Sequence, residues 1–185
     1  MNIRRFSVLL LSLALLSGCT SEAMRKSASP VLPPGAKVQN IYVTLTPEVE
    51  GALWYNEDVK PNRVLGAMKR NLKERDMLGK PSDRHLPKIE IVITDVRARS
   101  EGASIWVPLL SGEDRIVGDV IVRDANGQEL ERLKVKTTYA WGGPLGTNHL
   151  RMNYLYDLFA ERAAEQLTGR SLPQPVLDRI SSSKL

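Results

Sequence analysis

Two consecutive strand-like runs, the second of which alternates between apolar and polar residues, constrain the fold of this chain more than any other feature. They cover residues 116–124 and 130–141 and are joined by Asp124-Ala125-Asn126-Gly127. A period of two is typical of strands with one buried face, and an Asn-Gly pair between two such runs favours a tight hairpin. We therefore predict two adjacent antiparallel strands. The predicted buried face of the second consists of Leu133, Val135, Thr137, Tyr139 and Trp141, whereas Lys134, Lys136 and Thr138 are assigned to the solvent face.

Two more strands are predicted earlier in the chain. Residues 41–46 alternate between aliphatic residues and residues that carry a hydroxyl group, and Pro47 ends the run. Residues 89–96 place Ile89, Ile91 and Ile93 on one side and Val92 and Val96 on the other. A strand that is apolar on both sides is typical of the centre of a sheet.

Two amphipathic helices complete the pattern. The first covers residues 61–78, begins with Pro61 and stops at Gly79, and its apolar face holds Val64, Leu65, Met68 and Leu72. The second covers residues 148–168, with Asn148 as N-cap and Gly169 as the stop, and its apolar stripe holds Leu155, Leu158, Phe159, Ala163 and Leu167. The order β-α-β-β-β-α predicts an α/β (α+β) fold, a two-layer sandwich in which a mixed four-stranded sheet packs on two helices.

The N-terminus has the layout of an export signal. Arg4 and Arg5 precede an uncharged apolar run at residues 6–16. That run is about half of the roughly 20 residues that a helix needs to span a bilayer. It ends in Leu16-Ser17-Gly18-Cys19, which resembles the lipobox of bacterial lipoproteins. A secreted or signal-anchored protein whose single cysteine happens to fall here is the alternative.

The lipobox resemblance implies cleavage before Cys19, a thioether-linked diacylglycerol on its sulfur, and palmitate-type acylation of the new amino terminus. Cys19 is the only cysteine of the chain, so no intramolecular disulfide is expected. In enteric lipoproteins an Asp after the lipidated cysteine retains the protein at the inner membrane. Thr20 occupies that position here, and the resemblance therefore implies the periplasmic face of the outer membrane.

The composition of the chain divides it into four parts. We predict a signal peptide at residues 1–18, the lipidated Cys19 with a flexible Ser-, Ala- and Pro-rich tether at 19–37, a single periplasmic α/β domain at 38–169, and a loosely ordered tail at 170–185. The net charge of +5 falls to +3 without Arg4 and Arg5. Since 26 basic and 21 acidic residues are spread along the whole length, nucleic acid is not an expected partner.

The sequence offers few catalytic candidates. His85 and His149 are far apart and lack further ligands at metal spacing, and no nucleophile elbow is present. We therefore expect no enzyme activity, no metal and no cofactor apart from the covalent lipid. Asp95 and Asp119 could form an acid/base pair. We favour the alternative that they lie on solvent faces or form ion pairs with Arg97 or Arg123. The segment 141–148 is interpreted as a sharp strand-to-helix turn rather than an anion site, because it lacks the lysine of a nucleotide-binding loop.

An apolar run stands between two Gly- and Ser-containing segments at residues 105–110. Its predicted interaction residues are Ile105, Trp106, Val107, Leu109 and Leu110. Exposed apolar patches usually mark docking sites for a partner or a lipid interface. Burial of Trp106, Leu109 and Leu110 as a lid on the core, or as a short strand, is the alternative.

The stretch from Gly118 to Gly127, the lipobox and the order of elements together resemble small uncharacterised lipoproteins of Gram-negative envelopes. The architecture is similar to that of penicillin-binding-protein-activator lipoproteins and of the amino-terminal domain of the Tol-system translocation protein. The resemblance implies a non-enzymatic binding or assembly role, with the membrane and an envelope protein or cell-wall component as partners. A tethered enzyme with its site near residues 141–149, or a small-ligand carrier, is the alternative.

Overall fold

The protein is a mixed five-stranded sheet with helices on one face. The computed structural model describes residues 20–25, 31–53, 60, 62–99, 112–139 and 147–172. The strands are β1 (Thr20–Arg25), β2 (Asn40–Leu45), β3 (Lys88–Arg97), β4 (Asp114–Arg123) and β5 (Glu129–Tyr139), and the helices are α2 (Pro47–Leu53), α3 (Asn62–Glu74) and α5 (Asn148–Thr168). The order β-α-β-β-β-α of a mixed four-stranded sheet with two helices is confirmed, and β1 and α2 are additions to it.

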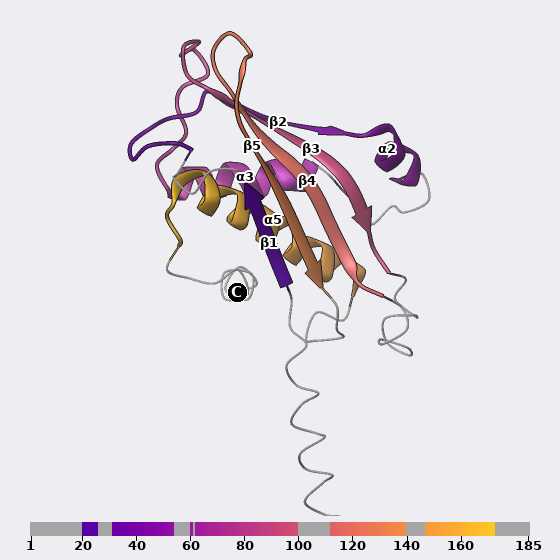
Figure 1. Ribbon diagram of the computed structural model, residues 1–185. Coiled ribbons are helices and arrows are strands. Elements are labelled where there is room, and N and C mark those ends of the chain that lie inside the picture. Colours follow the sequence, from indigo (N-terminus) through magenta and orange to yellow (C-terminus); the bar gives the residue numbers. More distant parts are fainter. Residues whose placement is uncertain are drawn as a thin grey trace, which may run out of the picture.

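The strand order across the sheet is β1-β5-β4-β3-β2. The β2–β3 pair is parallel, and the other three pairs are antiparallel. Helices α3 and α5 pack on each other and on the same face of the sheet, while α2 follows the end of β2 (Figure 1). The core lies between these two layers. Its central row crosses three strands at Ile91, Val120 and Leu133, each fully buried.

Strand β5 has the predicted buried face. Leu133, Val135 and Thr137 are 0% exposed and Tyr139 is 5% exposed, whereas Lys134 and Lys136 on the other face are exposed. Thr138 lies on the same face as Lys134 and Lys136, as predicted, but it is only 2% exposed rather than in contact with solvent. Trp141 lies outside the described residues.

An irregularity in β3 changes the predicted side of Val96. The register with β4 shifts between Ile93 and Asp95, so that Val96 stands opposite Ile116. An extra residue in one strand moves each side chain that follows it to the opposite face of the sheet. Val96 therefore packs against the core together with the isoleucines, rather than on the face of Val92 as predicted.

The helix ends differ from the prediction in two places. Helix α3 ends at Glu74 rather than near Gly79, because Asp76 adopts a left-handed conformation (φ 56°) and the Met77 amide donates to Leu72 O at 2.8 Å. The N-cap of α5 is Thr147, whose hydroxyl accepts from the Leu150 amide, rather than Asn148. The predicted stop at Gly169 is confirmed by its left-handed φ of 65°.

The predicted flexible tether at residues 19–37 was wrong for the described part of that segment. Thr20–Arg25 forms the edge strand β1, paired with β5 from Thr20↔Thr138 to Arg25↔Leu133. Further on, Leu32 is 4% exposed and its amide donates to Leu167 O at 2.9 Å. Composition favours an extended chain here, but pairing with β5 and packing on α5 incorporate it into the domain.

Candidate functional site

The residues singled out from the sequence lie mostly outside the described part of the structure. These are the lipidation residue and its cleavage signal, Cys19 with Leu16, Ser17 and Gly18, and the interaction residues Ile105, Trp106, Val107, Leu109 and Leu110. They stay predictions. The residues that flank the apolar run are described, however, and they show how the segment 100–111 is attached to the fold.

Three charged side chains meet inside the protein at this attachment point. Arg99 and Arg151 have side chains 1% exposed, and the Asp114 carboxylate between them is 0% exposed. Arg99 donates from its amide to Asp114 Oδ1 at 2.7 Å and from Nη2 to Oδ2 at 3.0 Å. Arg151 Nε donates to the same Oδ2 at 2.7 Å. We refer to Arg99, Asp114 and Arg151 as the buried arginine–aspartate cluster.

The cluster joins elements that are remote in sequence. Arg99 follows β3, Asp114 begins β4, and Arg151 lies in the first turn of α5. Arg99 Nη1 also donates to Gly112 O at 3.1 Å, and Arg99 Nη2 donates to Tyr139 O at 3.3 Å. Both ends of the segment 100–111 and the end of β5 are thus held together. Buried charges are retained only where they are paired and hydrogen-bonded, and here the pairing fixes these chain ends.

Two further contacts extend the cluster into α5. Arg151 Nη2 donates to Arg99 O at 3.2 Å and to the Asn148 side chain. The rings of Tyr139 and Tyr154 meet edge to face with centroids 6.0 Å apart. Such an arrangement adds to the stability gained from burial alone. The last residue of β5 and the first turns of α5 are therefore also tied to each other, on either side of the segment 140–146.

The chemistry of the cluster is structural. Its side chains are at most 1% exposed and bind one another and neighbouring backbone carbonyl groups, so a substrate has no access to them. None of these three residues was predicted from the sequence. The signal was nevertheless present, since Arg151 precedes Leu155 by one helical repeat and Asp114 precedes Ile116 by one strand repeat. A charged residue on an apolar face predicts a buried, paired charge.

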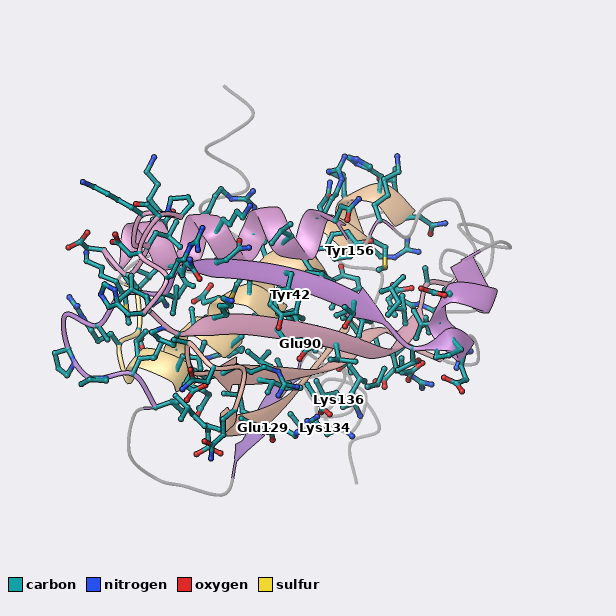
Figure 2. All side chains as sticks on the ribbon, turned by 90° about the horizontal axis from the view of Figure 1, so that it is seen from above. Tyr42, Glu90, Glu129, Lys134, Lys136 and Tyr156 are labelled. Carbon is teal, nitrogen blue, oxygen red and sulfur yellow. The ribbon has the colours of Figure 1, made fainter. Side chains whose placement is uncertain are left out.

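The face of the sheet away from the helices carries ion pairs. Arg123 pairs with Glu90 at 2.8 Å, Arg132 with Asp119 at 3.1 Å, and Arg115 with Asp95 at 2.5 Å. Figure 2 shows Lys134 and Lys136 on the same side, opposite α3. The hydrogen bond to Glu90 raises the pKa of Arg123 above its usual value. This face is a solvated surface held in place by cross-strand charges.

Asp95 and Asp119 lie on that face, as the sequence analysis favours, but the predicted partners were wrong. Arg115 takes the place of Arg97 as the partner of Asp95, and Arg132 takes the place of Arg123 as the partner of Asp119. The reason is that the cross-strand neighbours come from β4 and β5 rather than from the same strand. Asp119 also lies on the opposite side of the sheet from α5, so it is remote from His149.

The two histidines are exposed and separate. His85 stands in the loop before β3, whereas His149 begins α5 and contacts the Asn153 side chain at 3.3 Å. These positions are at opposite ends of the sheet. The start of β3, next to His85, pairs with the end of β4, whereas the first turn of α5, which holds His149, contacts Asp114 at the start of β4. Among the residues that the structure describes, no three His, Cys, Asp or Glu side chains are grouped to hold a metal ion. None of the described helices is long and apolar enough to cross a membrane.

Comparison with known proteins gives a fold but no family. No family model and no curated protein matches the chain. Among solved structures, a PelC dodecamer from Paraburkholderia phytofirmans is similar, with 13% identity and a TM-score of 0.52 over 80% of this chain and 97% of the other. A second PelC dodecamer crystal from that organism (14%, TM-score 0.49, covering 80% and 98%) and the rare lipoprotein B from Shewanella oneidensis (11%, TM-score 0.33, covering 78% and 96%) are more distant. At these identities the first likeness shows a shared fold.

Proposed function

We propose that the chain is a non-enzymatic lipoprotein of the bacterial envelope that binds a protein or cell-wall component. In this proposal, lipid on Cys19 anchors it to the periplasmic face of the outer membrane, with Thr20 as the sorting residue. The segment 100–111, with its apolar run, provides the binding surface. The lipobox supports the anchor, and the geometry around Arg99 and Asp114 supports the binding segment.

The observation that carries the binding role is the attachment of the segment 100–111. Its two flanking residues are joined by a 3.1 Å hydrogen bond from Arg99 Nη1 to Gly112 O. Asp114 accepts two further hydrogen bonds from Arg99. A segment whose ends are fixed has less conformational entropy to lose on binding than a free chain. Exposed apolar runs are typical of docking surfaces, and residues 105–110 are proposed as one.

The fold comparison supports an assembly role in general terms. The similar PelC structure is a dodecamer, so a chain with this fold is compatible with a larger complex. The two histidines lie at opposite ends of the sheet, and Asp119 and α5 lie on different sides of it. The tethered-enzyme alternative therefore lacks an assembled site among the described residues.

A crosslinking experiment in cells tests this proposal. A photoreactive amino acid replaces Trp106 in one strain and Asn126, at the tip of the β4–β5 hairpin, in a control strain. We expect a discrete crosslinked envelope partner from position 106 and none from position 126. Trp106→Glu should abolish copurification of that partner while leaving the melting temperature unchanged. A large fall in melting temperature, with no crosslink from position 106, would instead identify Trp106 as part of a lid on the core.

A further inference from the structure

Strand β1 begins at Thr20, the residue directly after Cys19. Consecutive Cα atoms are about 3.8 Å apart, so the first paired residue of the sheet is the immediate neighbour of the proposed anchor. A flexible tether would leave the domain free to tumble above the membrane. Here the chain enters a hydrogen-bonded strand at once, and the position of the anchor therefore restricts which end of the domain faces the bilayer.

The strand registers identify that end. Thr20 pairs with Thr138, Thr138 with Arg115, and Arg115 with Arg97. These residues form one row across four strands, which at about 4.8 Å per strand spans roughly 14 Å. The buried arginine–aspartate cluster lies at the same end, since Asp114 pairs with Tyr139 one position further along. Figure 1 shows β1 and β4 starting where β3 and β5 finish.

Charge at this end favours an anionic surface. Arg97 and Arg115 stand directly opposite each other on the face away from the helices, and Arg115 also forms an ion pair with Asp95. Arg97 is exposed, and the Arg115 side chain is 34% exposed beside Asp95. The neighbouring Lys136 pairs loosely with Glu113, at 3.8 Å. With Arg97, Arg115 and Lys136 against Asp95 and Glu113, this end carries a small positive excess, and guanidinium groups bind phosphate in a bidentate manner.

We propose that the domain stands on its own membrane with the Thr20–Thr138–Arg115–Arg97 row at the level of the lipid headgroups. This orientation rests on the proposed lipidation of Cys19. It places both ends of the segment 100–111 close to the bilayer surface, so the envelope partner of the proposed function would bind at that surface. The tip of the β4–β5 hairpin points away, because the 11 residues of β5 extend over about 35 Å at 3.4 Å per residue.

Fluorescence quenching in vesicles tests the orientation. The acylated full chain is reconstituted into vesicles of phosphatidylethanolamine and phosphatidylglycerol that carry a nitroxide quencher on the headgroup. Because Cys19 is the only native cysteine and is blocked by lipid, a thiol-reactive fluorophore labels a single introduced site. Glu113→Cys reports on the proposed membrane end, and Asn126→Cys on the hairpin tip serves as the matched control.

We expect the label at Glu113→Cys to be quenched several-fold more than the label at Asn126→Cys. A flexible insert of about 12 Gly and Ser residues between Cys19 and Thr20, with a mean span of roughly 20 Å, should reduce the quenching at Glu113→Cys at least twofold. Adding Arg97→Gln to that variant should reduce it further, because the charge contact then holds the domain down without help from the short link.

The outcomes separate the orientation from the anchor. A mass spectrum that shows acyl chains on Cys19, together with equal quenching at the two sites, would overturn the orientation alone. Quenching that is insensitive to the insert would contradict the role of the short link, and no effect of Arg97→Gln would contradict the role of charge. A chain without acyl groups on Cys19 would overturn the proposed anchor and the orientation that depends on it.

Discussion

Asp114 is the central residue of the buried arginine–aspartate cluster. Its carboxylate, 0% exposed, accepts from Arg99 and from Arg151 at 3.0 and 2.7 Å. Removing one member of a buried ion pair is strongly destabilising, because the charge that remains is buried without a partner. Two guanidinium groups would then face each other inside the protein.

Asp114→Asn is therefore expected to lower the free energy of unfolding by about 3–5 kcal/mol. Urea denaturation followed by circular dichroism measures the loss. Asp119→Asn makes the same chemical change on the same strand, but its ion pair with Arg132 is solvent-exposed on the arginine side (44%). Exposed pairs contribute up to about 1 kcal/mol, so equal losses in the two variants would contradict the role assigned to Asp114.

At the scale of elements, the contact between β4 and α5 determines how closely the two layers approach. Gly118 lies on the helix side of β4, where an added Cβ would stand 2.9 Å from Val92 O and 3.2 Å from Phe159 Cζ. Real Cβ atoms do not tolerate the first distance, so the strands and the helix would have to separate. In α3, by contrast, a Cβ on Gly66 would meet only Arg70 Nη1, at an ordinary 3.7 Å.

Gly118→Ala is expected to destabilise the protein by about 1–3 kcal/mol through overpacking. Gly66→Ala is expected to stabilise it by about 0.5–1 kcal/mol, because glycine in a helix interior costs that much relative to alanine. Thermal or urea unfolding of the two variants under identical conditions should therefore give changes in unfolding free energy of opposite sign. A stabilising effect at Gly118 would show that β4 and α5 are not packed as closely as described.

At the scale of the whole molecule, the proposed lipid and the described domain are joined without a spacer. Each buried methylene of an acyl chain contributes about 0.8 kcal/mol to membrane binding, and stable anchoring takes at least two signals. A multiply acylated Cys19 would hold the chain permanently. Under the proposed lipidation of Cys19, we expect membrane association to depend on this residue.

Mass spectrometry of the membrane-extracted protein is expected to show acylated Cys19 as the first residue. Cys19→Ala should prevent acylation, and we expect the variant to be absent from the outer-membrane fraction when cells are fractionated. Retention of residues 1–18 would contradict the predicted cleavage before Cys19, and an unmodified Cys19 in the membrane fraction would show that another feature holds the chain there.

Local pattern alone determined most of the elements of this protein. Alternation predicted β2 and β5, and the apolar run before the Asp124–Gly127 turn predicted β4. Helical spacing predicted α3 and α5, and Gly169 ended α5 as expected, because these signals come from residues a few positions apart. The lipobox is likewise a short contiguous motif.

The tertiary structure decided what depends on residues remote in sequence. Thr20–Arg25 carries no strong strand signal and becomes β1 because β5 offers a free edge more than a hundred positions later. Arg99 and Arg151 are 52 positions apart, and both are buried because Asp114 lies between them. Burial of a charge depends on whether a partner reaches it, and only the folded chain brings that partner into place.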